Sequence, residues 1–387
     1  MSIPIKNIIP AIHSGFEGMH PGVAIDNVSI DSRSLQNNSG TLFFALSGQN
    51  RDGHMYIKEL IDKGVLNFVV SYIPFEVRGK ANFFVVNNTL KALQDFSIYY
   101  RQLFDLPVIA ITGSSGKTIV KEWLNYLLGP DYNIIRSPKS YNSQVGVPLS
   151  VIGINEKHNL GIFEAGISTT GEMEKLQPII RPEIGILTNI GPAHDEGFAD
   201  RQEKIREKLK LFTGVKLLIL QKNIDVEKEL DAAVKTFTWS FGENSDVQIV
   251  TQHDGGNTIL SVVYHDQSFD ISIPFTDAPS IENAISCLMV LLHFGYSHEI
   301  IKERMAGLYP VELRLQVKNG INGCTLIDDS YSSDYQSLKI ALDFLEQHKT
   351  HSKKQSYYPM FSRAALKPKS FMLRSPNCFR GTISARL

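Results

Sequence analysis

The apolar positions of this chain follow two different patterns on either side of residue 106. Up to that point, short apolar runs such as 41–46 and 67–71 are separated by turn residues, and a helical pattern over 91–103 closes the segment. From Pro107 onward, longer apolar runs alternate with helical patterns, and the expected strands are 108–112, 160–164, 184–188 and 215–220. This alternation predicts an α/β fold with a doubly wound, mostly parallel sheet.

The pattern of apolar and polar positions changes twice more toward the C-terminus. Residues 248–264 and 269–273 alternate as in a meander of antiparallel strands, and 280–294 has the pattern of a buried helix. A new unit is expected near Leu313, with 325–329 as its first strand and 337–347 as its first helix. The expected organisation is three domains and a tail: 1–106, 107–312, an incomplete Rossmann-like third domain over 313–352, and 353–387.

The composition of the chain mainly excludes classes of partner and location. The 387 residues carry a formal net charge of −1, so no bulk field attracts nucleic acid or an anionic membrane. No apolar run is long enough to span a membrane, and the N-terminus lacks the pattern of a signal peptide. Three widely spaced cysteines predict reduced thiols in a cytoplasmic protein rather than a zinc site or a disulfide framework.

A glycine-rich turn between the strand at 108–112 and a helical pattern is the strongest candidate for chemistry. Such a turn presents backbone N–H groups to nucleotide phosphates, with a lysine for the β- and γ-phosphates and a hydroxyl for Mg²⁺. Ile111 stands where the generic phosphate loop has a glycine, so this is a shorter variant. A chance Gly-Lys-Thr turn is the alternative, and the flanking strand and helix disfavour it. The expected nucleotide-binding residues are Gly113, Ser114, Ser115, Gly116, Lys117 and Thr118.

Three further polar features follow predicted strands, where α/β sheets place ligands. They are a polar loop over 142–149, Glu164 at the end of a strand, and His194 after the strand at 184–188. Taken alone, Glu164 could be a solvated or helix-capping residue, and His194 is no more specific. Their order after a phosphate loop makes coincidence a poor explanation.

With these motifs the chain, from about residue 25 to residue 347, resembles the Mur ligases, the ATP-dependent amide-bond-forming enzymes of peptidoglycan synthesis. The motifs are 112–118, 141–148, 164–166, 188–194 and 328–331, and the stretches 31–33 and 42–54 resemble the family's uridine-nucleotide domain. The resemblance implies addition of D-alanyl-D-alanine to UDP-N-acetylmuramoyl-tripeptide through an acyl phosphate. The alternatives are a diaminopimelate- or lysine-adding ligase and a non-catalytic nucleotide-binding remnant. A simple phosphate-loop kinase or ATPase fits the ordered motifs less well.

The resemblance also implies roles for individual residues. Lys117, His194 and Lys208 would be catalytic, and Thr118, Glu164, His194 and Lys208 would hold Mg²⁺, with Lys208 carbamoylated. A solvated, charged helix face is the alternative for Lys208, and a hydrogen-bonded core amide is the alternative for Asn283, the expected adenine contact. Arg314 and Asp329 would reach ATP from the third domain. The expected substrate contacts are Ser32, Arg33, Asp52, His54, Asn142 and Ser143. The expected state is a monomer without nucleic-acid partners or membrane insertion.

The family pattern breaks in two ways. Ser143 and Ser332 stand where the family usually has asparagine, which keeps a hydrogen-bonding side chain. Residues 347–387 contain no Asp or Glu and nine Lys or Arg, whereas about four acidic residues would be expected at the chain's own frequency. Either a disordered basic tail that binds an acidic partner or a reading-frame slip would explain this composition.

A slip can be tested against the genetic code. If Ser356 has one of the TCN codons, the codons for residues 354–361 read one base earlier encode an apolar strand with a polar end, as a doubly wound domain requires. We therefore expect a single-base insertion near Lys353, a third domain cut short, and little or no ligase activity in this chain.

Overall fold

The computed structural model describes residues 2–18, 22–33, 35, 39–48, 51–191, 197–242, 244–265, 267–311, 316–319 and 325–328. The chain divides into two compact units, Met1–Gly307 and Leu308–Leu387. The expectations for His194, Arg314, Asp329, Ser332, the helix at 337–347 and the composition of 347–387 lie outside the described residues.

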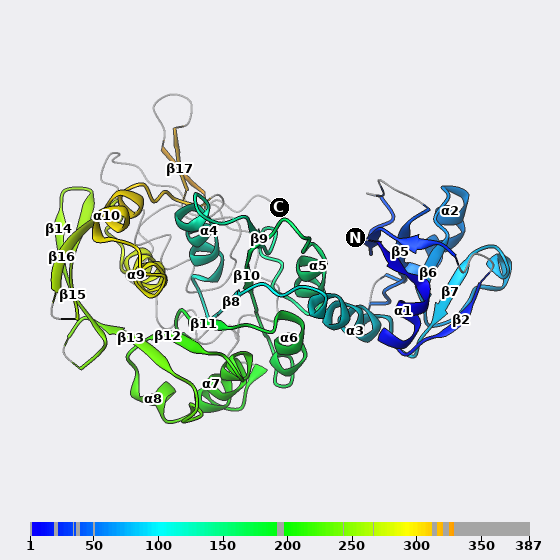
Figure 1. Ribbon diagram of the computed structural model, residues 1–387, viewed down its shortest axis with the longest axis horizontal. Coiled ribbons are helices and arrows are strands. Elements are labelled where there is room, and N and C mark those ends of the chain that lie inside the picture. The colour runs from blue at the N-terminus through cyan, green and yellow to red at the C-terminus, as the bar shows by residue number, and fades with distance from the viewer. Residues whose placement is uncertain are drawn as a thin grey trace, which may run out of the picture. The chain divides into compact units, whose positions relative to one another are not determined.

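The N-terminal part of the first unit is built on a five-stranded sheet (Figure 1). Its strands, in spatial order, are β2 (Gly15–Glu17), β7 (Asn82–Val85), β6 (Asn67–Val70), β5 (Thr41–Phe44) and β4 (Asn27–Ser29). β4 to β7 are parallel and β2 is antiparallel. Phe43 and Phe44 of β5 point into two different apolar clusters. Burial on both faces explains why these strands are uninterrupted apolar runs rather than alternating ones.

Short elements surround this sheet. β1 (Ile3–Pro4) pairs with β3 (Ala24–Ile25), and α1 (Ile5–Ala11) follows β1. The 3₁₀ turn η1 (Gly53–Tyr56) leads into α2 (Ile57–Asp62), and η2 (Phe75–Val77) lies between β6 and β7.

A nine-stranded sheet forms the centre of the unit, in the order β16-β15-β14-β13-β12-β11-β8-β10-β9. The parallel part comprises β9 (Ile134–Arg136), β10 (Leu160–Glu164), β8 (Val108–Thr112), β11 (Ile184–Leu187), β12 (Leu217–Gln221) and β13 (Thr236–Ser240). β14 (Val247–Asp254) is parallel to β13 and then begins an antiparallel meander with β15 (Asn257–Tyr264) and β16 (Gln267–Ile273). The doubly wound, mostly parallel sheet predicted from the sequence is confirmed.

Helices cover both faces of the parallel strands. Val108 and Ala110 of β8 belong to an apolar cluster with α5 (Gly146–Ile152) and α6 (Met173–Ile180). Because side chains alternate along a strand, Ile109 and Ile111 point to the other face. There α4 (Lys117–Leu128) packs against α9 (Ala278–His293). The remaining helices are α7 (Arg201–Leu209), η4 (Lys210–Phe212), α8 (Ile224–Glu227) and α10 (His298–Ala306).

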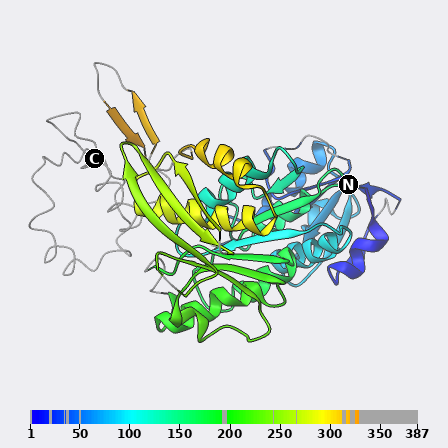
Figure 2. The same ribbon diagram turned by 60° about the vertical axis from the view of Figure 1, so that its left-hand side comes forward.

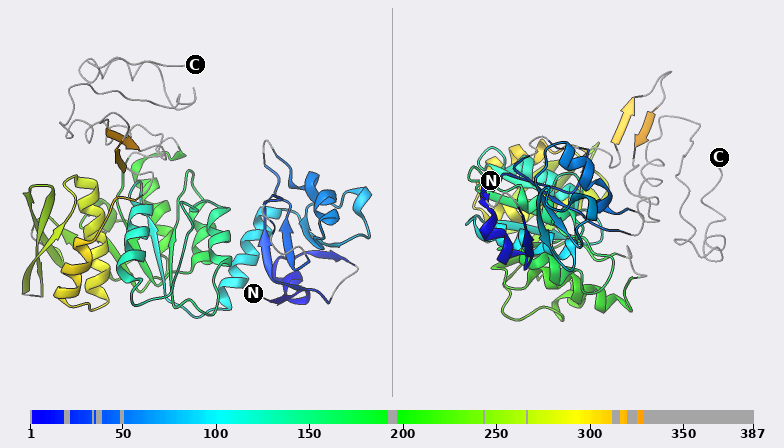
Figure 3. Two further views of the ribbon diagram at one scale, coloured as in Figure 1. Left: turned by 90° about the horizontal axis from the view of Figure 1, so that it is seen from above. Right: turned by 90° about the vertical axis from the view of Figure 1, so that its right-hand side faces the viewer.

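The meander is the long twisted ribbon in Figure 2, and α10 packs on its edge strand β16; the left view of Figure 3 shows the yellow helices beside the olive strands. Along β16, buried and exposed residues alternate, with Phe269, Ile271 and Ile273 buried. A sheet with one covered face produces this alternation.

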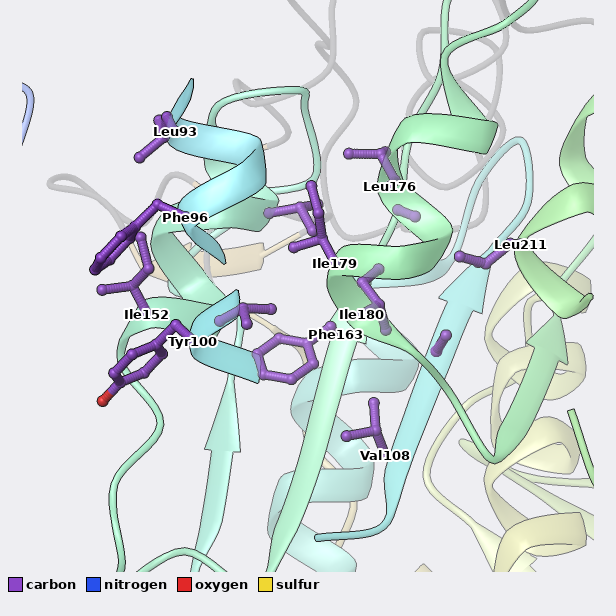
Figure 4. Close-up of a cluster of buried hydrophobic side chains, with 14 of the residues drawn as sticks. Leu93, Phe96, Tyr100, Val108, Ile152, Phe163, Leu176, Ile179, Ile180 and Leu211 are labelled. Carbon is purple, nitrogen blue, oxygen red and sulfur yellow. The ribbon is translucent and has the colours of Figure 1, made fainter. Parts of the chain in front are cut away.

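Helix α3 (Thr89–Gln102) joins the N-terminal sheet to the central one. Asn88 caps its start by accepting a hydrogen bond from the Lys91 N–H at 2.9 Å. In Figure 4 its residues Leu93, Phe96 and Tyr100 lie beside apolar side chains of α5, α6 and β10. Burial raises the pKa of Tyr100 to about 12, and its hydroxyl donates to the Ile154 carbonyl at 2.6 Å.

Arg101 sits at the end of α3 and is only 3% exposed. Its guanidinium donates to the carbonyls of Ile180, Phe104 and Leu106 at 3.1, 2.8 and 3.1 Å. These carbonyls lie at the end of α6 and in the connection to β8, where helix-terminal acceptors lack intrahelical partners. One buried cation thus joins the ends of two helices and the start of the central sheet.

In the second unit, β17 (Gln316–Asn319) pairs antiparallel with β18 (Thr325–Asp328). The expectation that 325–329 is the first strand of this unit is wrong, because 316–319 precedes it as a strand. The run at 316–319 is short and has polar residues at both ends, so its apolar content does not stand out. Within the described part of the chain, no helix is long and apolar enough to cross a membrane.

Candidate active site

The glycine-rich loop connects the end of β8 to the start of α4. Gly116, the residue before α4, has a φ of +82°, in the left-handed region that favours glycine. A Cβ atom there would lie 2.1 Å from Oδ1 of Asn283, so the missing side chain also makes room for α9. Among the described residues, no side chain caps the start of α4. Its N–H groups and helix dipole can therefore receive an anion.

Two lysines converge on the carbonyl of the first loop glycine. Nζ of Lys117 donates to the Gly113 oxygen at 2.8 Å, and Nζ of Lys208, from α7, donates to the same oxygen at 3.2 Å. The sequence predicted both residues for the site, and the structure brings them together although they are 91 positions apart (208 − 117).

Lys208 is 3% exposed and Lys204, one helical turn earlier, is 1% exposed. The alternative of a solvated helix face is therefore wrong for this side of α7. Burial lowers the pKa of Lys208 well below its usual value, and the nearby charges of Lys117 and Lys204 lower it further. A buried amine with cationic neighbours favours its neutral form, which is the nucleophilic form.

A carboxylate and a hydroxyl meet at the end of the neighbouring strand. Glu164, the last residue of β10, is completely buried, and its Oε2 accepts a hydrogen bond from Oγ1 of Thr118 at 2.9 Å. Oγ of Ser140 lies 3.0 Å from the same threonine hydroxyl. Hard oxygen donors of this kind suit Mg²⁺. The described residues contain no cluster of three His, Cys, Asp or Glu side chains.

Lys121, which the sequence analysis did not single out, touches the same carboxylate. Its Nζ lies 3.3 Å from Oε1 of Glu164 and 3.1 Å from Oε1 of Glu122. It also donates to the carbonyls of Ser137, at 2.7 Å, and Lys139. Its place one turn after Lys117 on a buried helix was the available signal.

The segment after β11 is hydrogen-bonded along the glycine-rich loop. Asn189 accepts from the Ser114 N–H through its carbonyl and from the Ser115 N–H through Oδ1, both at 3.0 Å. Thr188 donates from Oγ1 to the Ser115 carbonyl at 2.6 Å, and Gly191 accepts from Oγ of Ser114 at 3.0 Å. Sequence analysis identified this motif only for His194, and missed Thr188 and Asn189.

The polar loop before α5 lies beside the Glu164 strand end. The Asn142 carbonyl accepts a hydrogen bond from the Gly166 N–H at 2.8 Å. The Asn142 side chain packs against Gly166, within contact distance of the position that a Cβ atom on this glycine would take. Oγ of Ser143 accepts from the Gly146 N–H at 3.2 Å, at the start of α5. Ser143 is thus used locally, while its substrate contact stays a prediction.

A second polar cluster lies in the N-terminal part, where residues follow the carboxyl ends of β4, β5 and β6. After β4, Arg33 donates to both carboxylate oxygens of Asp31, at 2.9 and 2.8 Å, across the half-buried Ser32. Hydrogen bonds from Arg33 lower the pKa of Asp31 to about 2. After β6 come Ser71 and Tyr72. The carboxyl ends of neighbouring parallel strands are where α/β sheets bind ligands.

His54, which follows β5, is only 3% exposed and has both ring nitrogens engaged. Nε2 accepts from the Ser71 N–H at 2.9 Å, so the ring proton lies on Nδ1, 2.6 Å from Oδ1 of Asp52. The ring stacks on Tyr72 with centroids 4.3 Å apart, and the Tyr72 hydroxyl donates to Oδ2 of Asp52 at 3.2 Å. His54 is therefore placed to orient Asp52 and Tyr72.

We expect the stability contribution of Asp52 to disappear between about pH 4 and pH 2. Burial raises its pKa, but hydrogen bonds from the His54 N–H and ring and from Ser47 outweigh burial and lower it from 3.8 to about 2. A carboxyl with a depressed folded-state pKa stabilises above its unfolded value, and that contribution is lost as the pH falls through the folded value. Urea unfolding should show that the unsubstituted chain has a larger free energy of unfolding than Asp52→Asn above about pH 4, and that this difference shrinks as the pH falls to about 2. A gap independent of pH would contradict the expectation.

Comparisons with known proteins agree with this geometry. The sequence profile of the Mur ligase middle domain matches residues 111–291. UDP-N-acetylmuramoyl-tripeptide–D-alanyl-D-alanine ligase of Rickettsia prowazekii is 31% identical over 341 residues, covering 84% of this chain and 75% of that protein. The enzyme of the same name from Bacillus subtilis is 27% identical, covering 90% and 77%.

Solved structures show the same fold. MurF from Acinetobacter baumannii superposes with a TM-score of 0.79 at 23% identity, over 90% of this chain and 77% of that one. MurF from Thermotoga maritima in complex with ADP gives a TM-score of 0.72 at 23% identity, over 83% and 74%. Given the Rickettsia relative, of which three quarters is covered, and the matching middle domain, the chain belongs to the Mur ligase family.

Proposed function

We propose that this chain has the site of an ATP-dependent ligase of peptidoglycan precursor synthesis, of the type that joins D-alanyl-D-alanine to UDP-N-acetylmuramoyl-tripeptide. Because the composition of residues 347–387 departs from the family pattern, we expect little or no ligase activity in the chain as it stands. The names of its relatives support the substrates. The observation that carries the reaction type is the meeting of the Thr118–Glu164 pair with Lys117 and Lys208 around one glycine-rich loop.

The reaction has two steps, and this site fits the charge that develops in both. The tripeptide carboxylate attacks the γ-phosphorus of ATP, the bond to the ADP oxygen breaks, and an acyl phosphate forms. The dipeptide amine then attacks the acyl carbon, and phosphate leaves as the amide forms and the amine proton is lost. Negative charge gathers on phosphoryl and carbonyl oxygens, so fixed cations are more useful here than strong acids or bases. Lys117, at the start of α4, would neutralise the transferring phosphoryl group.

Thr118 and Glu164 fit a magnesium ion, because a threonine hydroxyl and a carboxylate are hard oxygen donors. The ion would supply charge neutralisation of the phosphates when bound. His194, which lies outside the described residues, and Lys208 are proposed for a second ion. Asn283, 4% exposed and beside Gly116, is proposed for adenine, with Arg314 and Asp329 from the third domain.

We expect Lys208 to carry a carbamate. A neutral lysine amine adds to carbon dioxide and releases a proton, and the lowered pKa of Lys208 favours that neutral amine. Carbon-13 NMR of the chain in labelled bicarbonate should show one carbamate signal that is absent from Lys208→Arg. Lys210→Arg is the control: Lys210 lies two residues further along the chain, at the start of η4, pairs with Glu207 and Glu174, and its substitution should leave the signal in place. An unchanged signal in Lys208→Arg would contradict this assignment.

Residues 1–106 are proposed as the domain that binds the UDP end of the substrate. The ends of β4, β5 and β6 bring Ser32, Arg33 and Asp52 to one edge of that sheet, with His54 behind Asp52. Asn142 and Ser143 would contact the substrate from the central domain, proposed as 107–312. We also propose a cytoplasmic monomer. The thiol of Cys287 is free and fully buried, and burial raises its pKa, so we expect it to be unreactive.

The test is ADP release from ATP with UDP-N-acetylmuramoyl-tripeptide, in the presence and absence of D-alanyl-D-alanine. In a chain with the reading frame restored near Lys353, release that needs both substrates supports the proposal, and release with lysine or diaminopimelate in place of the dipeptide would instead assign another Mur-type ligase. In the chain as it stands, little or no release is expected. Residues 347–387 contain no Asp or Glu, and this composition favours a second candidate function, a nucleotide-binding protein without ligase chemistry. Binding of ATP and of the UDP substrate without release would support that candidate.

A further inference from the structure

The proposed reaction leaves one completely buried cation of α4 without a role. Lys121 has no exposed surface, and its ammonium contacts two main-chain carbonyls and two carboxylates. Burying an ammonium costs free energy unless the group is paired and hydrogen-bonded. A buried lysine therefore does not simply take the place of an apolar core residue.

The two oxygens of the Glu164 carboxylate have different partners. Oε1 lies 3.3 Å from the Lys121 ammonium, whereas Oε2 accepts the Thr118 hydroxyl at 2.9 Å. The side chain is therefore held at both ends, and its rotation about the last bond is restricted. Only Oε2 faces the threonine proposed as the second oxygen ligand.

Lys121 also fixes the surroundings of this carboxylate. The Ser137 carbonyl accepts from its ammonium at 2.7 Å, and Oγ of Ser137 accepts from the Glu164 N–H at 3.3 Å. The Lys139 carbonyl accepts a further hydrogen bond, and Lys139 has a left-handed φ of +49°. Lys121 thus connects α4, the end of β10 and the loop that begins after β9.

We propose that Lys121 is a positioning residue that makes Glu164 a one-oxygen ligand and so selects Mg²⁺ over larger cations; this rests on the metal role given to Glu164 in the proposed function. Mg²⁺ keeps a small octahedral shell, whereas Ca²⁺ readily takes both oxygens of a carboxylate. Because Oε1 is in contact with the Lys121 ammonium, a cation that took both oxygens would have to displace that contact. The same ammonium balances the Glu164 charge before the metal arrives.

The first measurement is a calorimetric titration of ADP with Mg²⁺ and then with Ca²⁺. The unsubstituted chain should bind ADP more tightly with Mg²⁺, and Lys121→Met should lose about tenfold of that preference, as changes next to metal ligands commonly do. Glu122→Gln is the matched control, because it removes the other carboxylate on the same ammonium, and it should keep the preference. An unchanged preference in Lys121→Met, or an equal loss in Glu122→Gln, would overturn the proposal.

Thermal unfolding without metal or nucleotide gives a second measurement that does not depend on the proposed function. Lys121→Met should lower the Tm because Glu164 loses its cation, and adding Glu164→Gln should recover at least half of the loss. If Lys121→Met fails to fold, a folded double variant supports the proposal and an unfolded one overturns it. If the unsubstituted chain binds no ADP, the nucleotide role has failed, and the Tm comparison alone decides whether Lys121 balances Glu164.

Discussion

Lys117→Met is expected to weaken ADP binding by about 100-fold, which corresponds to about 3 kcal/mol, the upper range for a hydrogen bond to a charged group. Methionine keeps most of the apolar length of the side chain but removes the ammonium. That ammonium donates to the Gly113 carbonyl at 2.8 Å, within the loop it would serve. The expected loss is therefore one of charge at an ordered site. Calorimetric titration with ADP and Mg²⁺ measures it directly.

Lys216→Met provides the control for this experiment. Lys216 is a solvent-exposed lysine that pairs with Glu183, at the opposite end of β11 from the loop. ADP affinity in this variant should stay within about twofold of the unsubstituted chain, because exposed ion pairs contribute little. If Lys117→Met binds ADP as tightly as this control, Lys117 is not a phosphate ligand and the loop assignment fails.

Arg101→Met is expected to lower the free energy of unfolding by about 3–5 kcal/mol, within the range that three buried acceptors left without a donor would cost. Three carbonyl oxygens would lose their donor inside the protein, and each buried acceptor without a partner costs about 1–3 kcal/mol. Burial lowers the pKa of Arg101, yet the guanidinium stays charged, so the effect should not depend on pH near neutrality. Urea unfolding followed by circular dichroism gives the measurement.

Arg136→Met is the comparison for Arg101. Its guanidinium is 38% exposed and forms an ion pair with Glu122 at 3.0 Å. Removing it should cost no more than about 1 kcal/mol. A similar loss in both variants would mean that the three carbonyl contacts of Arg101 add nothing beyond an ordinary surface pair.

The parts of the site that could be predicted are those encoded in short stretches of chain. The phosphate loop could be predicted because its three parts are contiguous in the sequence. They are the strand at 108–112, the turn at 113–116 and the helix that follows. Glu164 was found for the same reason, since it ends an apolar run that could only be a buried strand. The alternation of strands and helices was enough to predict a mostly parallel sheet.

The parts that could not be predicted depend on contacts between distant segments. The charged stretch 201–210 has the composition of an exposed helix, and only tertiary packing shows that Lys204 and Lys208 are buried. Lys121 looks like an ordinary helix lysine until Glu164, 43 positions later, is placed beside it. Asn189 and Tyr72 likewise acquire a role only through partners on other strands. Pairing across a sheet edge leaves no local pattern in the sequence.

The hydrogen bonds between Asn189 and the glycine-rich loop have a consequence for exchange with solvent. Main-chain amides in an exposed glycine-rich turn normally exchange rapidly with deuterium, since nothing protects them. Here the Ser114 and Ser115 amides have acceptors within the protein, both on Asn189. Both should exchange slowly in the nucleotide-free chain. When a phosphate arrives, it would replace one acceptor by another, so these amides would change their NMR chemical shifts while remaining protected.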